Sequence, residues 1–476
     1  MPEWDVVDNL EADDFAVQWN QYDRSERDDA LKDLPGSIKS PELSRMMSLN
    51  IYNEKFRFYK KRNLQAAVKR IMEFRAANPS VDVMISFEPD NKLNPWFYWS
   101  QWYDYNPNTL RQFREWLSHS GPYAETGLLS GDGDKQNLTI TDVAQLANSD
   151  WTSWDQVDPP RDRPTNNPWH LTWTKFKRHL VSQHYADLAK WATEAGATKD
   201  MLYTTVPVEA STALTDNADG VTWSDVAGVS LQGGKPQDAR LGAILYGRNT
   251  RDEVPTPNGN SLLNAIRGNG DPWGVVEMSP SDIAFPHLMN SLADSYNTLF
   301  QLLNHGAYFI SPMTRSDGRW RAVLPERYSS YDSFAFTTFE PALYWWVSQW
   351  RDMPAGSVFF PFGLPGYNSN DGWLTGNAEL PVVENNQVVI PQGTSYTLVS
   401  PTWLEILADE VEVDGDWGDA KMVLRMKFED GSEFQSTNSK KIIVPKTGAK
   451  LTQIGIEWNE ITSPSALNEI RVYKRP

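Results

Sequence analysis

The sequence lacks cysteine altogether and contains only 6 histidines among its 476 residues. The lack of cysteine excludes a disulfide framework, a thiolate nucleophile and a cysteine-based zinc site. The few histidines form no His-Glu-x-x-His pattern, so we expect no bound metal cofactor. No run of about 18 apolar residues occurs, and we therefore expect no membrane partner.

Basic residues are also scarce: 44 Lys and Arg stand against 62 Asp and Glu, which gives a net charge of −18. This balance argues against a nucleic-acid partner, which needs clustered cations. It also disfavours an anionic substrate unless a local basic pocket overrides the sum. Residues 1–5 lack the basic start and apolar stretch of a signal peptide. We expect a secreted protein, extracellular or periplasmic, in a processed form, with a cytoplasmic location as the alternative.

Aromatic residues are abundant, with 21 Trp, 18 Tyr and 19 Phe. Most aromatic side chains fill cores. Several nevertheless stand among polar residues, as in residues 96–99 and 102–105. A flat apolar ring beside carboxylates and amides suits a sugar, which has one C–H face and an edge of hydroxyls. We therefore expect a carbohydrate substrate, with Trp96, Trp99 and Trp102 among the residues that bind it.

Helices and short apolar strands alternate through the first 380 residues. A helix over 56–77 ends at Asn78-Pro79, and a strand over 81–87 follows it. The same order recurs in the ranges that follow: a helix over 173–195, strands over 201–206, 226–231 and 241–246, a helix over 261–266, a strand over 273–276, a helix over 287–304 and a strand over 308–310. This alternation predicts an α/β fold of the (β/α)₈ TIM-barrel type.

Two further regions differ from this pattern. A loop inserted over about 117–168 is rich in Gly, Asp and Pro, and such loops usually shape a substrate cleft. After a boundary near residue 380, short alternating runs separated by turns predict a C-terminal all-β sandwich over 381–476. The sandwich is either ancillary or carbohydrate-binding. A structural calcium ion at 132–134 or 414–416 is an alternative to ordinary acidic turns.

Two glutamates, Glu88 and Glu277, each follow an apolar strand. In a parallel barrel, the carboxyl ends of the strands meet at the face where the substrate lies. Glycoside hydrolysis needs such a carboxyl pair, one to protonate the departing oxygen and one to attack the anomeric carbon or to activate water. Carboxyl groups about 5–5.5 Å apart indicate retention of configuration, and about 6.5–9.5 Å indicate inversion.

The stretch from Tyr52 to Glu88, residues 96–117, residues 173–206 and the run Trp273-Gly-Val-Val-Glu277-Met-Ser-Pro resemble glycoside hydrolase family 42 and related retaining (β/α)₈ glycosidases. The resemblance covers about 50–320. It implies that Glu88 is the acid/base on the fourth strand and Glu277 the nucleophile on the seventh. In the wider clan an Asn that binds the sugar 2-hydroxyl precedes the acid/base. Phe87 stands there, so either Asn91 substitutes for that Asn or the substrate lacks the group that it would bind.

Three further residues complete the predicted site. Tyr246, or alternatively Arg248, is expected to donate a hydrogen bond to Glu277, Trp320 to stack on a sugar, and Arg315 to bind a sulfate or carboxylate if the substrate carries one. The predicted fourth strand begins at residue 81, which leaves too few residues before it for three βα units. We therefore expect a divergent or N-terminally incomplete barrel.

Together these features predict a retaining glycoside hydrolase acting on a β-linked galactoside or a related plant or algal polysaccharide. One alternative is a non-catalytic glycan-binding protein built on a degenerate barrel, and another is an inverting glycosidase.

Overall fold

The computed structural model describes most of the chain, which divides into two compact units. Among the described residues, the first unit runs to Ile244 and includes Leu262, and the second contains Leu245, Tyr246 and the residues from Leu263 onward. The described residues are 18–24, 50, 53–87, 97–98, 101–102, 104–121, 137–162, 167–207, 231, 233–246, 262–268, 272–279, 291–312, 338–350, 352–445 and 448–475.

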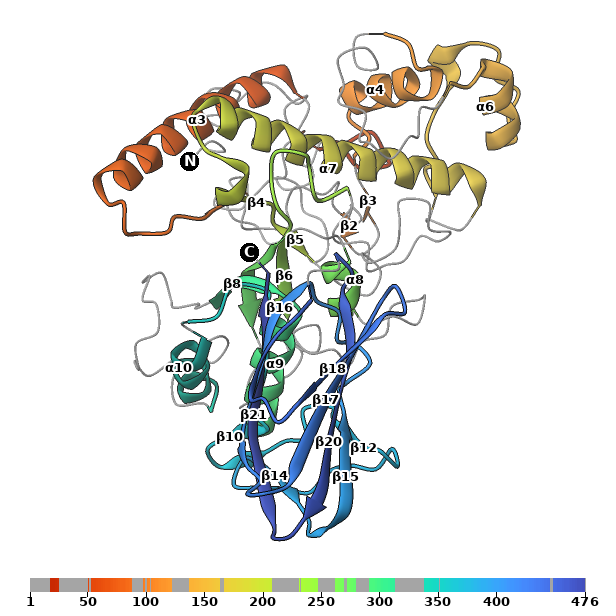
Figure 1. Cartoon of the computed structure of the whole chain (residues 1–476). Helices are drawn as coiled ribbons and strands as arrows, with labels where there is room; N and C mark the ends of the chain where they lie inside the picture. The colour runs from red at the N-terminus through yellow and green to blue at the C-terminus, as the bar shows by residue number, and fades with distance from the viewer. Residues whose placement is uncertain are drawn as a thin grey trace. The chain divides into compact units, whose positions relative to one another are not determined.

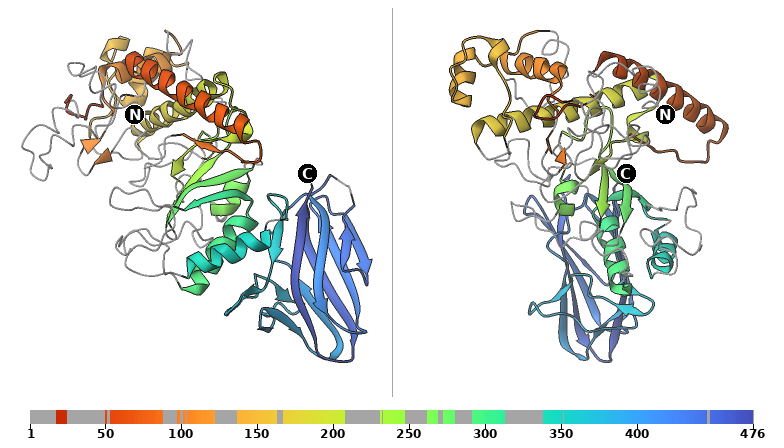
Figure 2. Two further views of the ribbon diagram at one scale, coloured as in Figure 1. Left: turned by 90° about the vertical axis from the view of Figure 1, so that its left-hand side faces the viewer. Right: turned by 180° about the vertical axis from the view of Figure 1, so that it is seen from behind.

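Two long helices lie side by side in the first unit, α3 (Glu54–Ala77) and α7 (Pro168–Glu194) (Figures 1 and 2). The side chain of Asn53 caps α3 by accepting from two backbone N–H groups, and that of Asn167 caps α7 by accepting from the N–H of His170. A proline begins α7, where its missing N–H is not needed. Both predicted helices are therefore confirmed, each beginning two to five residues earlier than the periodicity indicated.

The predicted insertion carries helices of its own. Helix α4 (Pro107–Ser118) ends at the start of this insertion, and α6 (Ile140–Ala147) and the short 3₁₀ helix η3 (Trp154–Gln156) lie within it. Side chains of α4 and α7 form an aromatic core, in which the Phe113 ring lies 4.9 Å from Trp173 and 5.1 Å from Phe176. Most tryptophans of this region that the structure describes thus fill the interior.

The strands of the first unit are short. Strand β1 (Ile85–Ser86) pairs in parallel with β4 (Leu202–Tyr203), which follows the turn η4 (Lys199–Met201). Strand β5 (Val206–Pro207) pairs in parallel with β6 (Gly242–Tyr246). A hairpin joins β2 (Phe97–Tyr98) and β3 (Gln101–Trp102). The strands predicted over 81–87 and 201–206 are therefore shorter in the structure than predicted, because only some residues of each range pair in a strand.

The second unit begins with α8 (Leu262–Arg267), most of which belongs to it, and with a parallel pair, β7 (Trp273–Ser279) and β8 (Ala307–Pro312). Helix α9 (Leu292–Asn304) connects these two strands, and α10 (Phe339–Trp350) comes later in the chain. Ser291 caps α9 through a capping box with Asp294. A parallel pair joined by a helix is the βαβ unit that the sequence predicts here.

The remainder of the second unit is the predicted all-β sandwich, the blue strands of Figure 1. One sheet has the order β12-β15-β20-β17-β18, and the other β13-β14-β21-β16-β19 with β9 beside β21. Strand β17 alternates buried and exposed residues, which fits two sheets packed face to face. The strands are β9 (Val358–Phe360), β10 (Gly363–Leu364), β11 (Tyr367–Asn368), β12 (Leu374–Thr375), β13 (Val383–Glu384), β14 (Gln387–Ile390), β15 (Gly393–Val399), β16 (Ala408–Asp416), β17 (Lys421–Phe428), β18 (Glu433–Thr437), β19 (Lys441–Ile443), β20 (Leu451–Ile461) and β21 (Ser465–Lys474).

The architecture is thus mixed helix and sheet with a sheet-rich C-terminal region. Within the part of the chain that the structure describes, the parallel strands form no closed barrel, and the eight-stranded barrel is not confirmed. The predicted strand over 226–231 lies, except for Leu231, outside the described residues. The domain boundary near residue 380 stays a prediction.

Candidate active site

Glu277 is the predicted catalytic residue whose surroundings the structure shows best. It lies inside β7, two residues before the strand ends at Ser279, and not directly after the strand as predicted. Its side chain is half-buried. The register against β8 is irregular between the Val275–Ile310 and Met278–Pro312 pairs, so Glu277 lies in the irregular part of the ladder. Such irregularities re-aim side chains and are common beside active sites.

Close packing fixes the strand that carries Glu277. The indole N–H of Trp273 donates to the carbonyl of His305 at 2.9 Å, and this tryptophan is fully buried. Gly274 faces the Phe309 ring so closely that a Cβ there would stand 2.2 Å from a ring carbon. A glycine is therefore required at position 274 for β7 to approach β8. The carboxylate of Glu277 thus projects from a strand that cannot shift easily.

In the first unit, hydrogen bonds fix Phe87, the residue that precedes Glu88. Phe87 continues β1: its N–H donates to the carbonyl of Tyr203 at 3.0 Å, and its carbonyl accepts from the hydroxyl of Thr205. The buried Tyr185 hydroxyl donates to the carbonyl of Thr205 at 2.5 Å. The chain therefore reaches position 88 from the carboxyl end of a parallel strand pair, as the sequence predicts. Glu88 itself lies outside the described residues.

The other predicted site residues cannot be placed as side chains. Trp102 belongs to β3 and Tyr246 to β6, but the structure describes their backbone only. The remaining ones lie outside the described residues: Asn91, Trp96, Trp99, Arg315 and Trp320. The distance between the two glutamate carboxyl groups, which decides between retention and inversion, stays untested.

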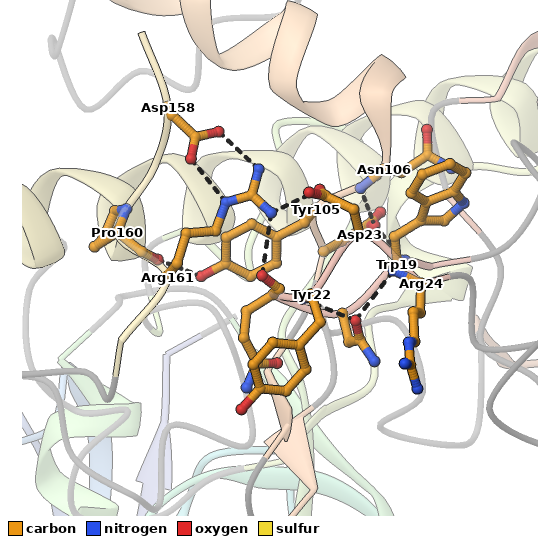
Figure 3. A network of polar contacts seen from close by, with 12 residues as sticks. Trp19, Tyr22, Asp23, Arg24, Tyr105, Asn106, Asp158, Pro160 and Arg161 are labelled. Atoms are coloured by element: carbon orange, nitrogen blue, oxygen red, sulfur yellow. Dashed lines mark hydrogen bonds and ion pairs between the residues drawn. The ribbon is translucent and has the colours of Figure 1, made fainter.

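One aromatic residue of the stretch 102–105, Tyr105, has a structural role instead of facing a sugar. Tyr105 is buried, and its hydroxyl donates to the carbonyl of Pro160 at 2.5 Å (Figure 3). The guanidinium of Arg161 lies 5.0 Å from the Tyr105 ring and forms ion pairs with Asp158 and Asp23. Polar neighbours in sequence therefore did not indicate exposure here, because the polar partners come from distant segments and cover the ring.

The sequence reasoning missed a buried carboxylate, Asp104, beside this cluster. Its two oxygens accept from the backbone N–H of Trp19 and of Asn106, both at 2.9 Å, and from the side chains of Asn50 and Thr109 at 2.7 and 3.0 Å. Burial raises the pKa of Asp104 to about 6, although each hydrogen bond lowers it. The four donors come from three segments, so this carboxylate joins them. No local sequence motif indicates that Asp104 is buried or that these segments meet at it.

A second missed carboxylate, Asp371, lies in the second unit. It accepts from the hydroxyl of Tyr296 at 2.5 Å and from the backbone N–H of Phe362 at 2.6 Å. Burial raises the pKa of Asp371 to about 7. Phe362 has a φ of 54°, a left-handed conformation that bulky residues seldom adopt. Asp371 therefore holds a strained turn between β9 and β10.

Two buried histidines, His170 and His305, are engaged within the protein. His170 is buried, with one ring nitrogen 2.7 Å from the Asn167 amide and the other 2.9 Å from Asp162. His305 is also buried; its Nδ1 lies 2.7 Å from the carbonyl of Gln301, and its ring packs on Trp403. His170 thus contacts the residue that caps the start of α7, and His305 contacts the last turn of α9.

The part of the chain that the structure describes contains neither a group of metal-ligating side chains nor a helix able to span a membrane. No three acidic or histidine side chains gather there into a metal-binding group. Asp414 accepts from Asn468 and Asp416 from the N–H of Gly418, while residues 132–134 lie outside the described ranges. None of the helices searched combines the length and apolar character needed to cross a membrane.

Comparisons with known proteins identify no family. No family model matches the chain, and no curated protein matches it either. Solved structures match weakly. A GH39 enzyme from Xanthomonas axonopodis pv. citri has 11% identity and a TM-score of 0.24, over 65% of this chain and 66% of that chain. A monomeric beta-xylosidase from Caulobacter crescentus CB15 has 10% identity and a TM-score of 0.22, over 63% and 68%.

A fucose binding module from Streptococcus pneumoniae has 13% identity and a TM-score of 0.16, over 19% of this chain and 74% of that chain. By their descriptions, these weak neighbours are glycosidases and a carbohydrate-binding module. The likeness in fold is weak, and a relationship to glycoside hydrolase family 42 is not shown.

Proposed function

We propose that this protein is a glycoside hydrolase that cleaves a β-linked galactoside or a related polysaccharide with retention of configuration. Glu277 acts as the nucleophile and Glu88 as the general acid/base, on a divergent (β/α)₈ barrel of the family 42 type. Asn91, Trp96, Trp99, Trp102, Tyr246, Arg315 and Trp320 are the expected substrate-binding residues.

One observation carries the proposal: Glu277 is a half-buried carboxylate near the carboxyl end of a strand in a parallel pair. That edge is where parallel α/β proteins place catalytic groups. The main-chain bonds of Phe87 at the carboxyl end of the β1–β4 pair support the same position for Glu88. Each glutamate is thus approached through a strand end fixed by packing or by hydrogen bonds, as positioned catalytic groups require.

The chemistry follows from these roles. The carboxylate of Glu277 attacks the anomeric carbon and forms a glycosyl ester, while Glu88 gives its proton to the leaving oxygen. Glu88, now ionised, takes a proton from water, and that water displaces Glu277 with a second inversion. Overall one glycosidic bond is hydrolysed, and both carboxyl groups return to their starting states.

The nucleophile assignment is tested by Glu277→Gln. We expect the rate on an aryl β-galactoside to fall by roughly three orders of magnitude or more, with an unchanged circular dichroism spectrum. Glu457→Gln, which alters another half-buried glutamate in the sandwich, serves as the matched control and should keep wild-type activity. Wild-type activity in the Glu277 variant, on any glycan that the enzyme cleaves, would overturn the assignment.

Added azide distinguishes a nucleophile from a merely supporting carboxylate. In a Glu277→Gly variant the small anion can occupy the vacated space and attack the anomeric carbon. We expect azide to restore turnover and to yield an α-glycosyl azide, identified by NMR. Restoration without that product would contradict the retaining mechanism.

The acid role is tested by Glu88→Ala on two substrates. General acid catalysis contributes roughly 10²–10⁴-fold, and a good leaving group needs little of it. We expect a loss in that range on the natural glycan and a much smaller loss on a dinitrophenyl glycoside, measured as kcat/KM. An equal loss on both substrates would exclude Glu88 as the acid.

A further inference from the structure

Helix α3 has a charge opposite to that of the whole chain. Its 24 residues include Lys or Arg at eight positions and Glu at only two, so 8 − 2 = +6, whereas the chain as a whole carries −18. The basic positions are Lys55, Arg57, Lys60, Lys61, Arg62, Lys69, Arg70 and Arg75. A concentration of cations on one element of an acidic protein marks it as a surface for an anionic ligand.

The cations nearest α7 have partners on that helix. Arg57 forms an ion pair with Asp187 at 2.6 Å, and Lys61 with Glu194 at 2.8 Å. The buried Lys60 ammonium lies 3.0 Å from Nε2 of His184, and burial together with Lys60 and Arg57 lowers the pKa of this histidine well below its ordinary value. These contacts fix α3 on α7 and leave its opposite face to solvent.

Three exposed cations form a line along that opposite face: Lys55, Arg62 and Lys69. They are spaced seven residues apart, which places each nearly above the last. At 1.5 Å per residue, neighbouring cations of the line are about 10 Å apart along the helix axis. That interval is close to the length of two pyranose rings joined end to end.

Aromatic rings stand between the first two cations. Phe58 is 64% exposed, and Tyr59 beside it is half-buried, with the two rings 5.4 Å apart edge to face. The Arg62 guanidinium lies 5.0 Å from the Tyr59 ring and so orders it. An apolar ring between two cations matches a sugar between two anionic groups, because the C–H face of a pyranose packs on aromatic rings.

We propose that the line Lys55–Phe58–Arg62–Lys69 on α3 binds an anionic polysaccharide that carries one sulfate or carboxylate on every second sugar. The proposal rests on the proposed function only in taking carbohydrate as the ligand class. A nucleic acid fits less well, because successive phosphates of one strand advance by only about 3.4 Å along the helix axis.

The binding test is affinity electrophoresis of the wild-type protein in gels that contain κ-carrageenan, agarose or neither. κ-Carrageenan is a galactan with one sulfate on each disaccharide, and agarose is nearly uncharged. We expect retardation by κ-carrageenan alone, and weaker retardation as salt is added. The triple variant Lys55→Ala/Arg62→Ala/Lys69→Ala should bind roughly tenfold more weakly, since each exposed ion pair contributes only a small part of the affinity.

A matched control removes the same charge elsewhere: Lys421→Ala/Lys427→Ala/Lys441→Ala, on exposed positions of the sandwich. It should bind like the wild type. Phe58→Ala should weaken binding and leave helix content unchanged. Equal loss in both triple variants would overturn the proposal in favour of net charge, and stronger binding to random duplex DNA would overturn it in favour of a nucleic acid. This experiment measures binding and not hydrolysis. Inactivity of the protein on every glycan would therefore refute the proposed function and leave the binding of κ-carrageenan by α3 unaffected.

Discussion

A buried aspartate organises each of the two units, and the two differ in how many donors surround them. Asp104 in the first unit accepts from four groups, and its pKa is raised to about 6; Asp371 in the second accepts from Tyr296 and Phe362, and its pKa is raised to about 7. Burial raises both pKa values, and hydrogen bonds to the carboxyl oxygens lower them. Both carboxyl groups are buried, and Asp104 has more donors to offset its desolvation than Asp371 has.

The sign of the pH effect is the same for both residues. Each folded pKa lies above the ordinary value of 3.8, so the folded state holds the proton to a higher pH than the unfolded state does. The stability from the neutral carboxyl group is therefore complete below about pH 3.8 and is lost as the pH rises through the folded pKa.

The largest expected effect belongs to Asp371. Asn resembles the protonated acid in shape and cannot ionise, so Asp371→Asn should remove the part of the pH dependence between about pH 4 and 8 that Asp371 contributes. We expect the free energy of unfolding of the wild type, relative to this variant, to fall by on the order of 4 kcal/mol over that range. Urea unfolding followed by tryptophan fluorescence measures it. Parallel profiles for the two proteins would refute the raised pKa.

Asp104→Asn should give a smaller change over a lower pH window. The fall relative to the variant should be on the order of 3 kcal/mol and should be complete near pH 6 to 7. A window that coincides with that of Asp371 would show that the four donors lower the pKa of Asp104 no more than Tyr296 and Phe362 lower that of Asp371. The double variant should show the sum of both changes, because the two sites share no partner.

The smallest effect is expected for Tyr296→Phe, which removes one donor from Asp371. Losing this buried hydrogen bond should destabilise the protein by about 1–3 kcal/mol at pH 5. The pKa of Asp371 should rise further, because one of the bonds that lower it is gone, and its titration in carbon-13 NMR should move to higher pH. An unchanged titration would assign the lowering to the backbone N–H of Phe362 instead.

The sequence predicted the elements that local rules determine. Helices α3 and α7 follow from their periodicity, and the long sandwich strands follow from alternation. The two-residue strands were drawn too long because apolar runs do not show where pairing ends. Asp104 and Asp371 were missed because Trp19, Asn50 and Tyr296 are remote in sequence, and only folding brings them to these carboxylates. Of the predicted catalytic pair, the structure describes the side chain of Glu277 alone.

The side-chain amide of Asn304 couples the last turn of α9 to the sandwich. It donates to the carbonyl of Phe359 at 2.9 Å and accepts from the N–H of the same residue at 2.8 Å. Phe359 lies in β9, whose partner is β21 close to the C-terminus. A gene fusion or module swap with its breakpoint at residue 380 would separate these two strands and expose an unpaired edge. The sandwich is thus poorly suited to exchange between proteins as an independent domain. A recombination event that keeps this protein folded should transfer α9, β9 and β21 together.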